Sequence, residues 1–166
     1  MRILAAMIAA LALVVAAIQA GQSTAVATGA STTRQAAKSA PGTPAVANYV
    51  RQAVKATNAR RSAKNLKRLK QHSCLRKYAK KWAKKMAARQ QLVHQSLKPI
   101  LRRCDLHMTG ENIAVGYPNG RAVVKAWMAS PPHRRNILTK RYRLIAIGAY
   151  RDADGRWWSS QLFGAR

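Results

Sequence analysis

Acidic side chains are scarce in this chain of 166 residues. Glu111 is its only glutamate, and three aspartates complete the acidic set, against 31 lysines and arginines. The formal net charge is therefore +27, which predicts that the protein works close to something anionic. A single glutamate between Gly110 and Asn112, where helix propensity does not explain it, predicts a local site rather than a solubilising surface charge.

Motifs of several functional classes are missing. The chain has no nucleophile elbow, no His-Glu-x-x-His run and no visible catalytic triad, which argues against the common hydrolase arrangements. It also has no zinc-finger spacing, no RNP-type aromatic motif and no helix-turn-helix pattern. We therefore expect no sequence-specific recognition of nucleic acid.

Long apolar runs are confined to the start of the chain. After Met1 and Arg2, an unbroken apolar and alanine-rich run extends from Ile3 to Ile18, which is typical of a bacterial export signal. We assign residues 1–20 to a signal peptide. An uncleaved membrane anchor is the alternative, since about 16 apolar residues fall just short of the roughly 20 that span a bilayer.

Large apolar side chains are almost absent from residues 21–43, which are rich in Ser, Thr, Gly and Ala. Such a segment cannot bury enough surface to offset the entropy of ordering, so we expect a flexible linker there. The remaining residues, 44–166, are enough for one hydrophobic core and not for two. We predict a single folded domain that is a monomer.

Cysteines are also few. Cys74 and Cys104 are the only pair, and the oxidising compartment reached through an export signal favours a disulfide between them. Closing a loop of about 30 residues in this way would stabilise the fold by roughly 3 to 4 kcal/mol on the chain-entropy model.

Basic residues recur every two or three positions between Arg51 and Arg103. In helical segments this spacing spreads the charge around the polar face, which predicts an electrostatic coat. Such a coat favours anionic envelope polymers, lipid headgroups or, without sequence specificity, nucleic acid as partners, with binding that weakens in salt. The alternative is a general basic bias of the source proteome or simple solubility.

Apolar residues that recur at intervals of three and four predict a series of helices. We expect Ser73 to act as the N-cap of the second helix. Ser130 followed by Pro131 should open the last one, with His133 in its first or second turn. The other histidines, His72 and His107, are expected at the surface or at strand ends with no assigned role. The predicted helices cover residues 44 to about 64, 73 to about 93 and 121–128, followed by one that starts at 131.

β-branched and aromatic residues replace the helical spacing after Arg143. The two runs of this kind flank Asp154 and Gly155, which predicts a β-hairpin with an Asp-Gly turn. Two strands alone are only marginally stable, so a third should come from residues 102–108 or 112–115. The predicted class is therefore mixed, with helices packed against a small sheet.

Several short motifs follow one another in an order that resembles a known family. Over residues 45–164 the sequence is similar to the CAP superfamily (cysteine-rich secretory proteins, antigen 5 and pathogenesis-related 1 proteins), in its shorter bacterial SCP-like form. The resemblance implies an α+β fold, a three-layer α-β-α sandwich with a small, mostly antiparallel sheet, a cleft on one face, and secretion. The motifs are Asn58-Ala-Arg-Arg61, His94-Gln-Ser96, Gly110-Glu-Asn-Ile-Ala114, Trp127-Met-Ala-Ser130, His133-Arg-Arg-Asn-Ile-Leu138 and Gln161-Leu-Phe-Gly164.

The resemblance also places candidate residues in the cleft. Larger family members hold two histidines and two glutamates there, and His94 resembles the first histidine while Glu111 resembles the first acid. Ser130 stands where the second acid is expected, and Trp158 stands where the second histidine is expected. His133 belongs to the motif of the bacterial branch and is expected near the same cleft. A mechanism that needs two carboxylates is therefore in doubt.

We group His94, Glu111, Asn112, Ser130 and His133 as the predicted cleft and polar cluster. In one interpretation Glu111 fixes a histidine tautomer and holds neighbouring loops together. In a second, His94 and His133 bind a divalent cation such as zinc, with water in an open position. In a third, Glu111 is the general base of a hydrolase. We assign no catalytic residue.

The functional prediction is a secreted or envelope-associated protein that is not an enzyme. We expect it to bind an anionic envelope component or a lipid-like ligand through the cleft, with the basic coat holding it against anionic surfaces. A metal-dependent extracellular hydrolase that uses the same residues is the alternative. A cationic toxin that acts on the membranes of competitors is a further hypothesis.

Overall fold

The computed structural model describes residues 43–166. The predicted signal peptide, residues 1–20, and the predicted linker except for Thr43 lie outside the described residues. Thr43 caps the first helix, because its side-chain oxygen accepts a hydrogen bond from the backbone N–H of Val46 at 3.4 Å. Among the described helices, none combines the length and the hydropathy needed to cross a bilayer.

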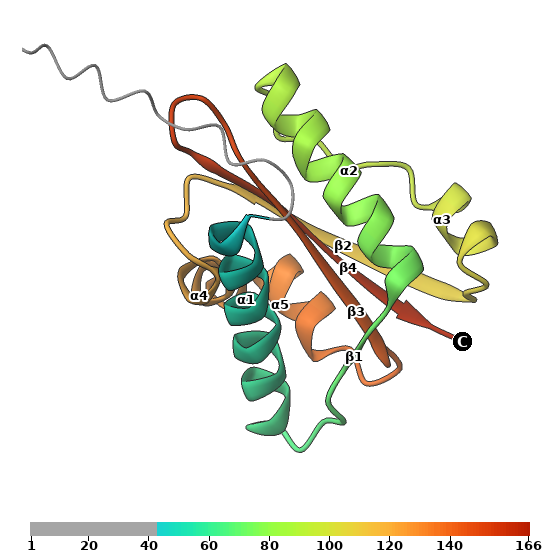
Figure 1. Cartoon of the computed structure of the whole chain (residues 1–166). Coiled ribbons are helices and arrows are strands. Elements are labelled where there is room, and N and C mark those ends of the chain that lie inside the picture. Colours follow the sequence, from blue (N-terminus) through green and yellow to red (C-terminus); the bar gives the residue numbers. More distant parts are fainter. Residues whose placement is uncertain (1–42) are drawn as a thin grey trace, which may run out of the picture. The chain divides into compact units, whose positions relative to one another are not determined.

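Helices cover both faces of a four-stranded sheet (Figure 1). The helices are α1 (Pro44–Ser62), α2 (Ser73–Arg89), α3 (Lys98–Arg103), α4 (Gly120–Ala129) and α5 (Pro131–Leu138), and the strands are β1 (Lys70–Gln71), β2 (Met108–Val115), β3 (Leu144–Arg151) and β4 (Trp157–Ala165). Helices α1, α4 and α5 lie on one face of the sheet, and α2 and α3 lie on the other. This arrangement confirms the predicted α+β class and the α-β-α sandwich.

The strand order is β1-β3-β4-β2, and the sheet is mostly antiparallel. β3 and β4 form the predicted hairpin, in which Ile147 lies opposite Gln161, and Gly155 in its turn has a φ of +79°. The third strand is β2, which contains the predicted residues 112–115 and extends back to Met108; most of the alternative stretch 102–108 is instead the end of α3 and a turn. β1 pairs with β3 in parallel over only two residues.

The second helix differs from its prediction at both ends. Its N-cap is His72 and not Ser73, because the His72 ring Nδ1 accepts a hydrogen bond from the N–H of Leu75 at 3.4 Å. His72 therefore has a structural role, as a helix cap, that its sequence context did not indicate. The helix stops at Arg89 because Gln90 takes a left-handed conformation with a φ of +51°, which is a common helix ending. The following residues, including His94, form the loop between α2 and α3.

α2 crosses β3 in close contact. A Cβ atom at Gly148 would lie 2.1 Å from the backbone of Ala79, so only glycine allows this approach. Alternate β3 residues point to opposite layers: Ala146 packs with α2 and α3, whereas Ile145, Ile147 and Ala149 pack with α1 and α4. β3 is therefore held between α1 and α2.

The predicted disulfide is present. Cys74 and Cys104 are joined with an S–S distance of 2.03 Å and a Cα–Cα distance of 5.7 Å. The bridge links the first turn of α2 to the residue that follows α3. It therefore bounds a segment that includes the loop with His94.

Arg61 does not belong to the predicted electrostatic coat. Its side chain is fully buried and donates hydrogen bonds to four backbone carbonyls, those of Lys67 (2.9 Å), Ile137 (2.7 Å), Thr139 (2.8 Å) and Tyr142 (3.2 Å). Burial, with a smaller effect of the nearby Arg143 charge, lowers the pKa of this guanidinium. Arg61 therefore holds the end of α1 against the segment that connects α5 to β3, through the carbonyls of Thr139 and Tyr142.

Candidate functional site

Glu111 lies on β2, the edge strand next to β4, and its side chain is only 1% exposed. A buried carboxylate is costly unless it is hydrogen-bonded. Oε2 accepts hydrogen bonds from His94 Nδ1 at 2.9 Å and from the backbone N–H of Gln95 at 3.2 Å. Oε1 accepts from Gln95 Nε2 at 2.6 Å and from Ser160 Oγ at 2.8 Å. Because a carboxylate has about four acceptor positions, the protein itself occupies all of them.

The loop that carries His94 is held in place by this carboxylate. Glu111 binds both the His94 ring and the backbone and side chain of Gln95. Since the carboxylate can only accept, Nδ1 of His94 is the donor of this bond, and in the neutral form of the ring Nε2 is then an acceptor. The His94 side chain is 59% exposed, so this acceptor is reachable by a ligand.

His133 and Ser130 line a cavity at the open side of β2. The cavity has a volume of about 250 Å³, and Tyr117 and Trp127 contribute to its wall. Burial lowers the pKa of His133, with a smaller effect of His94. The backbone carbonyl of His133 accepts a hydrogen bond from Asn112, the neighbour of Glu111 in β2. His94, Glu111 and His133 thus lie in one region, although they come from distant segments of the chain.

Asn112 points to the opposite face of the sheet from Glu111. Its amide donates to Gln161 Oε1 at 2.9 Å and to the backbone carbonyl of His133 at 3.2 Å. Its oxygen accepts from Asn136 Nδ2 at 2.9 Å, and Gln161 in turn donates to Thr57 Oγ1 at 2.8 Å. Asn112 is fully buried. It therefore positions the start of α5 against β2 and does not face the His94 ring.

Within residues 43–166, no three His, Cys, Asp or Glu side chains come together in an arrangement that could hold a metal ion. Glu111 uses its oxygens for internal hydrogen bonds, as described above. The described part of the chain therefore offers no complete set of side-chain ligands for a metal at this site.

Two further residues of the Glu111 cluster, Gln95 and Ser160, were missed as site residues in the sequence analysis. Gln95 lies inside the His94-Gln-Ser96 motif and Ser160 directly precedes the Gln161-Leu-Phe-Gly164 motif, yet neither has a local pattern that indicates its role. Ser160 reaches Glu111 because of the β2–β4 register, in which Ile113 lies opposite Ser160. Only the sheet pairing could have identified it.

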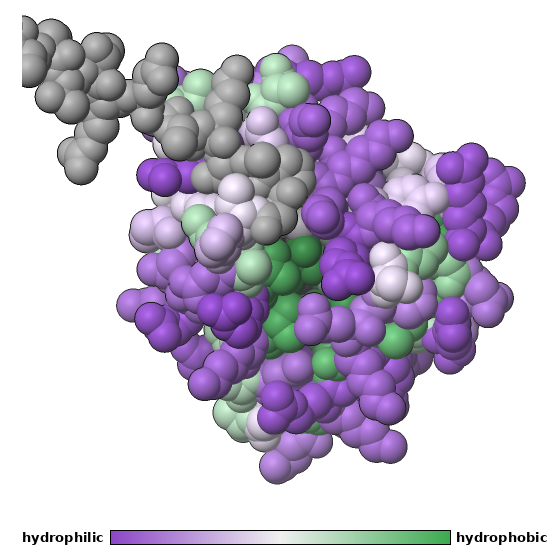
Figure 2. Space-filling view, in the orientation of Figure 1, coloured by the Kyte–Doolittle hydropathy of each residue, from purple (hydrophilic) through white to green (hydrophobic). Residues whose placement is uncertain are grey.

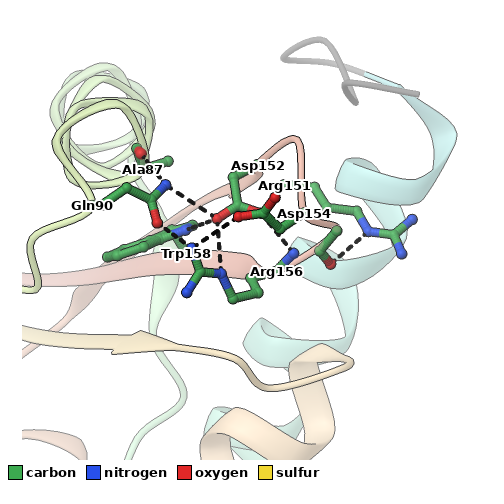
Figure 3. A network of polar contacts seen from close by, with 8 residues as sticks. Ala87, Gln90, Arg151, Asp152, Asp154, Arg156 and Trp158 are labelled. Carbon is green, nitrogen blue, oxygen red and sulfur yellow. Dashed lines mark hydrogen bonds and ion pairs between the residues drawn. The ribbon is translucent and has the colours of Figure 1, made fainter. Parts of the chain in front are cut away.

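Trp158, which stands where the family resemblance places a second histidine, belongs to a different polar network (Figure 3). Its indole N–H donates to Asp152 Oδ2 at 2.8 Å. Arg156 donates to Asp152 through its backbone N–H at 2.8 Å and its Nε at 3.2 Å, and Gln90 donates at 3.3 Å. Burial would raise the pKa of Asp152, but these hydrogen bonds and the Arg156 charge together lower it. This network fixes the turn of the β3–β4 hairpin against the C-terminal end of α2.

Almost all of the positive charge remains uncompensated. Glu111 pairs with His94, Asp152 and Asp154 pair with Arg156, and Asp105 lies 3.9 Å from Arg166. In the part of the chain that the structure describes, Arg156 and Arg166 are the only arginines or lysines in ion pairs. Since the sequence contains no other acidic side chain, the remaining cations depend on solvent ions or on a partner for neutralisation.

Comparison with known proteins gives consistent matches. The family model described as "CAP: Cysteine-rich secretory protein family" matches residues 54–163. The uncharacterized protein YkwD of Bacillus subtilis (strain 168) is 33% identical over 126 residues, which are 72% of this chain and 48% of that protein.

Solved structures share the fold. An extracellular protein containing a SCP domain from Bacillus anthracis str. Ames is 26% identical with a TM-score of 0.64, over 71% of this chain and 40% of that chain. An outer surface protein from Borrelia burgdorferi has a TM-score of 0.63 at 24% identity, over 68% of this chain and 89% of that chain, and this likeness concerns the fold alone. The chain spans less than half the length of the two Bacillus proteins.

Proposed function

Because this chain belongs to the CAP family, the cysteine-rich secretory protein family, we propose that it is a secreted, non-enzymatic CAP domain that binds an anionic component of the cell envelope. The observation that carries this proposal is the uncompensated charge, since only Arg156 and Arg166 have ion-pair partners among the described lysines and arginines. Such a surface attracts polymers that carry phosphate or carboxylate groups.

The state of Glu111 supports a binding role over a catalytic one. A general base needs a free lone pair directed at the proton that it removes. All four acceptor positions of Glu111 instead take hydrogen bonds from His94, Gln95 and Ser160. In this proposal the carboxylate shapes the cleft, and His94 Nε2 and His133 offer the polar groups that contact the ligand.

Binding to isolated cell-wall sacculi tests the proposal. The full chain should bind sacculi that retain their phosphate-containing polymers and should lose most binding once these polymers are removed by mild acid or hydrogen fluoride. Vesicles of phosphatidylcholine with and without phosphatidylglycerol distinguish a lipid phosphate from a polymer phosphate. Equal binding to the stripped and the intact sacculi, together with no preference for anionic vesicles, would contradict the proposal.

Two sets of variants separate the coat from the cleft. Replacing the exposed lysines Lys77, Lys81 and Lys84 of α2 by glutamine should weaken binding, whereas replacing the same three by arginine keeps the charge and should not. His133→Asn should weaken binding about twofold to tenfold, the value of one lost hydrogen bond. Unchanged binding of the His133→Asn variant would show that the cleft does not contact the ligand. The exposed basic residues alone would then account for binding.

A metal-assisted hydrolase is the second candidate, favoured by the exposed His94 ring that Glu111 holds through Nδ1. Its test is metal analysis of the purified protein, combined with an activity screen of the Glu111→Ala variant. The absence of stoichiometric metal and of any Glu111-dependent activity would rule it out. Zinc bound at one equivalent and lost in a His94→Ala, His133→Ala variant would favour it.

A further inference from the structure

Among the described residues, one edge of the sheet has no partner strand for most of its length. β1 pairs with β3 only at Leu144 and Ile145, because the chain turns at His72 into α2. From Ala146 to Arg151, β3 has β4 on one side and no strand of the described part of the chain on the other. An unpaired strand edge is a template for pairing with another extended segment.

The backbone groups at this edge point outward at every second residue. His72 donates its N–H to the carbonyl of Ile145, so the backbone of Ile145 faces away from β4. Since this direction alternates along a strand, the N–H and C=O groups of Ile147 and Ala149 also point away from β4, although both residues are largely covered, at 2% and 4% exposed, between the helices that flank β3. Within residues 43–166, no turn, loop or side chain hydrogen-bonds to them.

A groove of about 590 Å³ runs along the same edge. Ile147 forms its floor, and Val46, Val50 and Val54, spaced one helical turn apart on α1, form one wall. Figure 2 shows this region as a hydrophobic strip flanked by hydrophilic residues. The α1 side of the groove is therefore an apolar wall that an added strand would contact.

The other wall and the rim of the groove are basic. Arg76 and Lys80, one turn apart on α2, line the wall opposite the valines, and Arg51, Lys55 and Arg68 complete the rim. All five are exposed, and none has an ion-pair partner among the described residues. The groove thus favours a partner that supplies negative charge.

We infer that the open edge of β3 binds an extended acidic segment of another protein, which joins the sheet as an additional strand. Successive side chains of a strand point to opposite sides, so one set would face the valines of α1 and the alternate set would face Arg76 and Lys80. The segment therefore has apolar and acidic residues in alternation over about six positions. Strand addition of this kind takes its affinity from backbone pairing and its specificity from the alternate side chains.

The residues of this chain before position 43 do not have the required chemistry. They contain no aspartate or glutamate, and their charged side chains are Arg2, Arg34 and Lys38. An anionic polymer or a lipid would satisfy the rim but could not pair with the amides of Ile147 and Ala149 in a β ladder. This inference uses neither His94 nor His133 and stands independently of the proposed function.

Binding of short labelled peptides to the full chain tests the inference. The probe is an acetylated and amidated peptide of alternating glutamate and valine, seven residues long by design to cover about six positions of the edge. One control has the same composition with the glutamates and the valines in separate blocks. A second control is the alternating peptide with N-methyl groups on every second amide, which keeps the charge and removes the backbone donors.

We expect the alternating peptide to bind at least about tenfold more tightly than either control, since both backbone pairing and side-chain placement contribute. On binding, hydrogen exchange of the Ile147 and Ala149 amides should slow. Arg76→Glu with Lys80→Glu should lower the affinity about tenfold or more, because like charge would then face the acidic side chains. The matched variant, Lys77→Glu with Lys84→Glu, makes the same change in net charge on exposed positions of α2 outside the groove and should lower it much less.

Three results would overturn the inference. Equal binding of the N-methylated peptide would show that charge alone attracts the probe. Equal losses in the two charge-reversal variants would show that the groove is not the site. The absence of exchange protection at Ile147 and Ala149 in a saturated complex would exclude strand addition. Because all four substituted residues are exposed, circular dichroism should show an intact fold in both variants.

Discussion

Replacing Arg61 by alanine should destabilise the domain far more than replacing its neighbour Arg60. Arg61 is fully buried, and its guanidinium satisfies four backbone carbonyls. Arg60 is exposed in the same turn of α1. The two adjacent arginines therefore provide a matched comparison in which helix propensity and the change in net charge are the same.

The expected magnitude follows from the carbonyls that lose their donors. A hydrogen bond to a charged group contributes about 1.5 to 3 kcal/mol net, but contacts that share one side chain are not additive. The bonds to Lys67 and Thr139 are only partly buried, so water can replace part of them. We expect Arg61→Ala to lower the free energy of unfolding by about 3 to 5 kcal/mol, because the two buried carbonyls, those of Ile137 and Tyr142, would each be left unsatisfied at about 1 to 3 kcal/mol and the packed side chain would be lost.

Urea unfolding of the oxidised protein measures this difference. With a slope of about 2 kcal/mol per molar urea, the Arg61→Ala midpoint should fall by about 2 M. The Arg60→Ala variant should change the free energy of unfolding by no more than about 0.5 kcal/mol. Arg61→Lys should lie between the two, because an ammonium has three donors and cannot reach all four carbonyls. A loss below about 1 kcal/mol for Arg61→Ala would refute the assignment of this arginine as a structural centre.

The remaining predictions concern the candidate site and the disulfide. Glu111→Gln should lower the free energy of unfolding by about 1 to 3 kcal/mol, because the amide N–H₂ of glutamine would face hydrogen-bond donors. The NMR signals of His94 should shift in this variant. Unchanged stability would contradict the hydrogen bonds assigned to Glu111. The pKa of His133 in the folded protein lies below its ordinary value of 6.5. Above about pH 6.5 the imidazole is neutral in both the folded and the unfolded state. As the pH falls from there to the lower folded pKa, the unfolded chain binds the proton first, so the free energy of unfolding decreases. The wild type should therefore lose stability relative to His133→Asn as the pH falls from neutral to that pKa, and parallel curves would exclude the effect. Reducing the Cys74–Cys104 bridge should lower stability by about 3 to 4 kcal/mol, as measured by urea unfolding with and without reductant; a Cys74→Ser, Cys104→Ser variant should match the reduced protein.

Residues with a strong local signature could be predicted from the sequence. The hairpin was recognisable from its β-branched runs and Asp-Gly turn, and the structure confirms it. The disulfide followed from cysteine number and the export signal. The single glutamate, Glu111, stood out because of its rarity, and its burial and hydrogen bonds are consistent with a local role.

Other features depend on tertiary structure and have no local signature. Arg61 is one of many basic residues in its segment, and only the positions of distant carbonyls distinguish it from Arg60. Glu111 and Asn112 are adjacent in sequence, yet the pleat sends their side chains to opposite faces of the sheet and into separate networks. His72 caps α2 because its ring meets the N–H of Leu75, although serine at the next position fits the usual preference better. The roles of these residues follow from their positions in the folded chain and not from their residue types.

The salt dependence of envelope binding tests the central proposal most directly. The affinity of the full chain for sacculi that retain their phosphate polymers should be measured between about 50 mM and about 200 mM salt. If uncompensated cations drive binding, the logarithm of the affinity should fall linearly with the logarithm of the salt concentration, by about tenfold or more over this range. An affinity that stays constant over the same range would contradict the proposal that the positive charge holds this protein on the envelope.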